Sequence, residues 1–167
     1  MTARPRRRVS AAPKLEIVVR SARWNRRSTA KTVVRKAILA AAKAASTSRA
    51  ELAIVLADDS AVRTLNHDWR GKDTATNVLS FPAVAPAGKT RSAPPYIGDI
   101  VIAYQTVARE ARDEGKPFDH HLAHLAVHGF LHLPGYDHDN DRDANKMERL
   151  ERSILARLDI PDPYALA

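Results

Sequence analysis

Short apolar runs of strand length alternate with longer segments of helical periodicity, and this alternation most limits the folds open to the chain. Four runs predict strands, at 15–20, 52–57, 77–81 and 97–103. Apolar residues recur at helical spacing in five other segments, near 29–41, 59–69, 105–114, 118–133 and 141–158. The pattern predicts a single α+β domain, in which a small mixed four-stranded sheet packs with about five helices.

Two of the predicted helices indicate which of their faces is apolar. In the helix that follows the possible capping residues at 58–60, the apolar positions are Val62, Leu65 and Trp69. The apolar stripe of the last helix consists of Ala144, Met147, Leu150, Ile154 and Leu158.

Composition limits the class of protein. A chain of 167 residues with 44% hydrophobic and 28% charged residues is neither disordered nor membrane-embedded, and no apolar run reaches the ~18 residues of a membrane span. The absence of cysteine excludes disulfides, thiolate metal ligands and a cysteine nucleophile, and it fits a cytoplasmic protein. Residues 1–13 are predicted to be a basic, disordered arm, and residues 14–167 one domain.

The net charge of +8 is unevenly distributed. Residues 1–49 hold 14 lysines and arginines and one acid, Glu16, whereas residues 50–167 hold 13 basic and 18 acidic residues. A split of this kind predicts a basic arm or face that meets a polyanion such as nucleic acid, although a solvated charged surface is an alternative. Only nine aromatic residues are present, so an extended base-stacking platform is not expected.

Six of the seven histidines lie between positions 120 and 138. His128 and His132 are four residues apart, so on a helix both imidazoles face one metal ion. Pro134 ends the helix and Gly135 permits a sharp reversal, which returns His138 to the same site. Three neutral imidazoles suit Zn²⁺ and leave a fourth coordination position for water, so the predicted site, on a helix and the following turn, is catalytic.

Neighbouring polar residues are secondary candidates. His124 lies one turn before His128 on the same face, where it would support a ligand or contact substrate, although a purely structural role is favoured. Asp137 or Asp139 would orient a metal-bound imidazole. His120 and His121, at the start of the helix, are expected to be solvated.

Two other metal-site motifs fit less well. The histidine spacing matches the zinc protease signature H-E-x-x-H-x-x-G-x-x-H, except that Gly129 replaces the glutamate that acts as general base. A protease needs that glutamate to protonate the leaving amine, whereas phosphodiester cleavage does not. The acids from Asp137 to Glu148 have the spacing of a calcium loop, but Arg142 replaces its glycine, and an acidic first turn of the last helix is favoured.

Several segments together resemble the YbeY family of bacterial endoribonucleases and rRNA maturation factors. They are Leu65-Asn66, Trp69-Arg70-Gly-Lys72-Asp73, Thr76 to Pro82, Gly98 to Ile102, and His124 to His138 with its string HGFLHLPGYDH. The likeness covers roughly residues 14–160. Ala75 and Trp69 depart mildly from the family pattern, which usually has Pro and often has Tyr there, and the arm lies outside the family core.

The resemblance implies a zinc-dependent ribonuclease that prefers single-stranded RNA. It implies one Zn²⁺ per chain, three ligands at His128, His132 and His138, and a cytoplasmic role in small-subunit (16S) rRNA maturation and ribosome quality control. The implied partners are rRNA precursors, the small ribosomal subunit and its assembly factors, with no membrane.

The resemblance also maps a family arginine onto Arg70. At the end of a helix, its guanidinium would bind a phosphate and stabilise the charge that develops during phosphoryl transfer. The alternative is a structural ion pair with Asp68 or Asp73. Lys72 would add a second phosphate contact, although Asp73 partly cancels its field.

The attacking group would be water or the RNA 2′-hydroxyl. A rival interpretation is a non-catalytic ribosome-assembly factor that holds a structural zinc ion.

Overall fold

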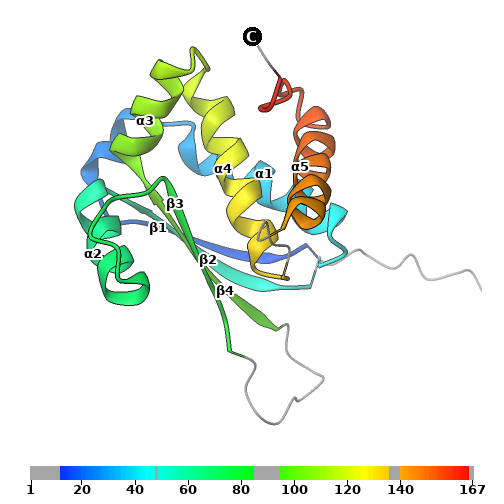
Figure 1. Ribbon diagram of the computed structural model, residues 1–167, viewed down its shortest axis with the longest axis horizontal. Helices are drawn as coiled ribbons and strands as arrows, with labels where there is room; N and C mark the ends of the chain where they lie inside the picture. Colours follow the sequence, from blue (N-terminus) through cyan, green and yellow to red (C-terminus); the bar gives the residue numbers. More distant parts are fainter. Residues whose placement is uncertain (1–11, 48, 85–94, 136–139, 166–167) are drawn as a thin grey trace, which may run out of the picture.

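A four-stranded mixed sheet forms the centre of the protein in the computed structural model, which describes residues 12–47, 49–84, 95–135 and 140–165 (Figure 1). The sheet order is β1-β2-β4-β3. β1 pairs with β2, and β2 with β4, in parallel, whereas β3 pairs with β4 antiparallel. The strands are β1 (Lys14–Val19), β2 (Glu51–Ala57), β3 (Val78–Pro82) and β4 (Tyr96–Ala103).

Five α-helices accompany the sheet within the described residues, and each matches a predicted segment. They are α1 (Ala30–Ala44), α2 (Asp59–Arg70), α3 (Tyr104–Asp113), α4 (Phe118–His132) and α5 (Asp141–Ala156). The α+β prediction is therefore confirmed. The sequence pattern missed a short 3-10 helix, η1 (Ala22–Arg26), because its one buried residue, Trp24, gives no periodicity.

The two faces of the sheet are covered differently. On one face, α1, α4 and α5 bury the larger core with strand residues such as Ile54, Ile100 and Ile102. On the other face, α2 packs a smaller cluster that includes Val62, Leu79 and Val101. Because strand side chains alternate between faces, β3 has α4 on one side and α2 on the other (Figure 1).

The ends of the helices explain two sequence motifs. Asp58 caps α2 by accepting a hydrogen bond from the Ala61 amide at 3.0 Å. Asn140 caps α5 in the same way, so the following acids Asp141 and Asp143 form its first turn. This arrangement is the acidic helix start that the sequence favours over a calcium loop.

One apolar position differs from the prediction. Val62 of α2 is fully buried, but Trp69 is 72% exposed. The smaller core ends before the last turn of α2 and does not cover the indole. Among the described residues, no helix is both long and apolar enough to cross a membrane.

Candidate metal centre

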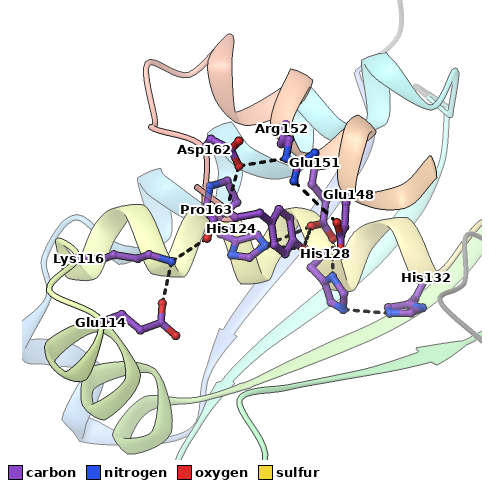
Figure 2. Close-up of polar contacts among 11 residues, drawn as sticks. Glu114, Lys116, His124, His128, His132, Glu148, Glu151, Arg152, Asp162 and Pro163 are labelled. Carbon is purple, nitrogen blue, oxygen red and sulfur yellow. Dashed lines mark hydrogen bonds and ion pairs between the residues drawn. The ribbon is translucent and has the colours of Figure 1, made fainter. Parts of the chain in front are cut away.

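Three histidines of α4, His124, His128 and His132, lie in a row that faces α5 and the C-terminal segment (Figure 2). Ring centroids are 6.3 Å apart for His124 and His128, and 4.8 Å apart for His128 and His132. The row is partly accessible, since the side chain of His124 is 14% exposed and that of His128 27%. The expected common face is confirmed for these three residues.

A carboxylate that the sequence analysis did not single out lies against this row. Glu151 of α5 is completely buried, with a side-chain exposure of 0%. Its Oε1 is hydrogen-bonded to His128 Nδ1, and its Oε2 is hydrogen-bonded to the Tyr164 hydroxyl and lies 3.2 Å from His124 Nε2. Three polar groups from two other segments therefore compensate the burial of this acid.

The surroundings of Glu151 shift the pKa of its carboxyl group. Burial alone raises this pKa, but hydrogen bonds from His124, His128 and Tyr164 outweigh it and lower the pKa to about 2. An ionised carboxylate only accepts hydrogen bonds, so both histidine nitrogens and the tyrosine hydroxyl are donors. Burial and the Glu151 carboxylate correspondingly raise the pKa of Tyr164.

The donor role of His128 Nδ1 directs its other ring nitrogen. In a neutral imidazole that donates through Nδ1, the lone pair is on Nε2. This Nε2 lies 3.1 Å from Nε2 of His132. Two nitrogens that bind one zinc ion tetrahedrally at ~2.0–2.1 Å are about 3.3 Å apart. The separation of the two nitrogens is therefore compatible with their binding one metal ion.

A second set of metal-ligating atoms overlaps the first. His124, His128 and Glu151 each offer an atom, and these atoms lie within 4.8 Å of one another. The structure thus contains a His/His/Glu group that could hold a metal, next to the His128–His132 nitrogen pair.

Three predicted residues, Asp137, His138 and Asp139, fall at 136–139 and lie outside the described residues. The turn that leads to them is described, and Gly135 has a φ of +104°, a conformation that favours glycine. Gly135 therefore has the kind of backbone conformation that the prediction requires of it, and the return of His138 to the site stays a prediction.

Gly129 has a packing role that accounts for the missing protease glutamate. A Cβ atom at this position would lie 2.9 Å from Val78 Cγ2 and 3.0 Å from Ile100 Cγ2. The Gly129 carbonyl also accepts a hydrogen bond of 2.7 Å from Ser80 Oγ. This side of α4 presses against the sheet, so a glutamate would not fit there.

Arg70 ends α2, on the opposite face of the sheet from the core that α4 buries. Its expected alternative partners are engaged elsewhere: Asp73 binds Arg63 Nε at 2.8 Å, and Asp68 lies 3.1 Å from His67 Nδ1. Within the described residues, Arg70 forms no ion pair. The structural ion pair that the sequence offered as an alternative is therefore not observed there.

Glu151 and Tyr164 are the functional candidates that sequence reasoning missed. Glu151 lies four residues after Met147 and three before Ile154, on the apolar stripe of α5. An acid at a core position is a signal of a buried polar site, because an unpaired charge there is costly. Nothing in the sequence distinguishes Tyr164, which follows Pro163 near the C-terminus.

The expectation that His121 is solvated is wrong. This residue is 4% exposed, and its Nε2 lies 2.7 Å from Glu110 Oε2. Position 121 lies about one turn before His124, with ring centroids 6.3 Å apart, but its imidazole contacts α3 through Glu110.

The fold has a counterpart among solved structures. The solution structure of a Thermotoga maritima protein aligns with a TM-score of 0.51 and 20% sequence identity, covering 91% of this chain and 99% of that chain. At this identity the likeness concerns the fold alone, and it places the chain in the same structural class.

Sequence comparisons identify the family. The family model described as Endoribonuclease YbeY matches residues 18–159. A protein of Rhodopseudomonas palustris named Endoribonuclease YbeY is 58% identical over 158 residues, which cover 93% of this chain and 83% of that protein. A Bradyrhizobium diazoefficiens protein of the same name is 55% identical over 157 residues, covering 92% of this chain and 86% of that protein. The chain belongs to the YbeY endoribonuclease family, as its motifs indicated.

Proposed function

We propose that this protein is a zinc-dependent endoribonuclease that cleaves single-stranded RNA. We further propose that it acts in the cytoplasm on small-subunit rRNA precursors, in contact with the small ribosomal subunit and its assembly factors, during maturation and quality control. Family membership supports the ribonuclease activity. The single observation that carries metal dependence is the pair of imidazole nitrogens, His128 Nε2 and His132 Nε2, 3.1 Å apart beside the buried carboxylate of Glu151.

The proposed ligands are His128, His132 and His138. Glu151 then acts behind His128 as the carboxylate that fixes the ring and its tautomer, a frequent arrangement around zinc. Its complete burial and three donors favour this role, because a metal bound to Glu151 would have to displace those hydrogen bonds. His124 acts as a second support for Glu151, and Asp137 is proposed to orient one of the imidazoles.

The metal and the protein residues would divide the chemistry. When bound, zinc supplies Lewis acidity beside the scissile phosphate. Glu151 holds the His128 ring in one orientation, and Arg70 binds the phosphate and balances the charge that develops on it. Water or the RNA 2′-hydroxyl would attack the phosphorus and lose its proton. A phosphorus–oxygen bond of the backbone then breaks, and the departing sugar oxygen takes up a proton.

The basic N-terminal part of the chain supports RNA as the substrate. Exposed cations surround η1 and α1, and within the described residues none of them forms an ion pair: Arg20, Arg23, Arg26, Arg27, Lys31, Arg35 and Lys36. Such a surface binds phosphates through counterion release. We propose that the arginines of residues 1–13 add to this sequence-independent affinity.

The first test separates the two possible ligand sets. His132→Ala removes one proposed ligand but leaves His124, His128 and Glu151 intact. We expect the variant to lose its zinc and its chelator-sensitive cleavage of unstructured RNA, measured by metal analysis and by gel. His67→Ala, which changes a 62%-exposed histidine outside α4, is the control and should retain both.

The outcomes are distinct. Full zinc occupancy in His132→Ala would assign the metal to the His124, His128 and Glu151 group instead. Zinc binding by the wild-type protein without cleavage of structured or unstructured RNA, rRNA precursors included, would favour the non-catalytic assembly factor.

A further inference from the structure

The end of α2 exposes a large aromatic surface. Trp69 is 72% exposed, whereas the other tryptophan of the chain, Trp24, is 3% exposed and donates its indole N–H to the Ala57 carbonyl at 2.8 Å. Trp69 contacts Phe81 of β3 edge to face, with ring centroids 6.1 Å apart and an interplanar angle of 65°. The contact holds one side of the indole and leaves the rest accessible.

Two exposed cations follow Trp69 in the sequence, and the nearby acids already have partners. Arg70 and Lys72 are both exposed and flank Gly71, whose φ of +68° ends the helix. Asp73 is bound by the Arg63 guanidinium, through hydrogen bonds of 2.8 and 2.9 Å. Asp68 lies against His67. The electrostatic potential at Arg70 and Lys72 is therefore more positive than the alternation of acidic and basic residues in this part of the sequence suggests.

The exposed indole and the candidate metal centre flank the same edge strand. Phe81, on one face of β3, contacts Trp69. Ser80, the preceding residue, points to the other face and donates to the carbonyl of Gly129, which lies between His128 and His132 on α4. Among the described residues, the edge strand β3 lies between the two regions, so a single strand of RNA that passes around this edge would meet both.

We propose that Trp69 forms a base-stacking subsite for single-stranded RNA, which holds a base next to the scissile phosphate that Arg70 is proposed to bind, and that Lys72 binds a neighbouring phosphate. This inference rests on the proposed function for the identity of the ligand. An indole offers its face to any nucleobase, and stacking of this kind needs an unpaired base. The subsite thus gives a physical reason for a preference for single strands over duplexes, in which the bases are already stacked.

Tryptophan fluorescence of the wild-type protein tests the subsite directly. Titration with a short single-stranded oligoadenylate, in the presence of chelator, separates binding from metal-dependent cleavage. We expect quenching of the exposed tryptophan, and no quenching in Trp69→Tyr, where only the buried Trp24 emits. An abasic oligoribonucleotide of the same length, which has the phosphates without the bases, should bind without quenching.

Affinity measurements with labelled RNA add a second readout. Trp69→Leu retains an apolar contact with Phe81 but removes the aromatic face, and we expect it to bind single-stranded RNA about 5- to 150-fold more weakly, the equivalent of ~1–3 kcal/mol. Trp69→Tyr should restore most of the affinity. The control is Tyr96→Leu. Tyr96 is a second exposed aromatic residue, with 48% of its surface accessible, but it is hydrogen-bonded to Asp99 and lies near Glu16, so its acidic surroundings do not favour RNA.

The possible results separate this inference from the proposed function. Two results overturn the stacking subsite and leave the ribonuclease proposal intact. One is single-stranded RNA that binds without quenching, and the other is quenching by duplex or abasic RNA that equals the quenching by single-stranded RNA. Quenching by single strands in a protein that cleaves no RNA supports the subsite and contradicts the ribonuclease. If no RNA binds at all, the subsite is wrong.

Discussion

The carboxylates of Glu151, on α5, and Asp73, after α2, both have a pKa below the usual range, but their surroundings differ. Glu151 is completely buried, and hydrogen bonds from two histidines and a tyrosine outweigh the effect of burial on its pKa. The side chain of Asp73 is 63% exposed, and its pKa is lowered by its hydrogen bond and ion pair with Arg63. The same direction of shift thus arises from an enclosed network in one region and a solvated pair in the other.

The difference indicates how each region works. Around Glu151, water is excluded, so the imidazoles are held in one orientation before a metal binds. At the end of α2, the charged groups remain in water, where their interactions are weak and sensitive to salt. We therefore expect substitutions in the first region to affect folding and metal binding, and substitutions in the second to affect RNA.

The largest expected effect is that of Glu151→Ala. The variant leaves buried donors of His124, His128 and Tyr164 without their acceptor, so the free energy of unfolding of the metal-free protein should fall by about 3–5 kcal/mol. Urea denaturation measures this change. Glu148→Ala is the matched control, because Glu148 is on the same helix with a 38%-exposed side chain and should change stability by less than about 0.5 kcal/mol. Equal stabilities of the two variants would contradict the view that the buried carboxylate of Glu151 matters more for folding than a solvated one.

Arg70→Ala should affect the cleavage of RNA and not the stability of the protein. The guanidinium is exposed and is not a proposed ligand, so stability and zinc content should stay unchanged. If Arg70 stabilises charge at the scissile phosphate, single-turnover cleavage by the zinc-loaded protein at saturating enzyme should slow by about 10²–10³-fold. A lower affinity for RNA with an equal rate at saturation would limit Arg70 to binding.

The smallest expected effect is that of Arg63→Ala. Because the pKa of Asp73 is lowered in the folded protein, its ion pair contributes stability above the unfolded pKa of about 3.9, and this contribution is lost progressively as the pH falls from that value through the lower folded pKa. Wild type and variant should therefore differ slightly at pH 7 in low salt, and not at pH 2 or in high salt. Thermal unfolding at the two pH values checks this, and a difference that persists at pH 2 would mean that the arginine acts through packing.

The secondary structure was predictable because local patterns specify it. Short apolar runs predicted the four strands, and helical spacing predicted the five α-helices. Asp58 and Asn140 are capping residues at the positions where α2 and α5 begin. The row of His124, His128 and His132 was likewise predictable, since residues four apart on a helix always share a face.

The sequence by itself therefore determined the elements, the row of imidazoles and the family. The tertiary structure decided what lies against them. It brought Glu151 and Tyr164 to the histidines from α5 and the C-terminal segment, left Trp69 outside the smaller core, buried His121 against Glu110, and paired Asp73 with Arg63 instead of Arg70. The physical reason is that periodicity specifies the face of a helix on which a side chain lies, whereas its burial and its partners depend on packing between segments far apart in the chain.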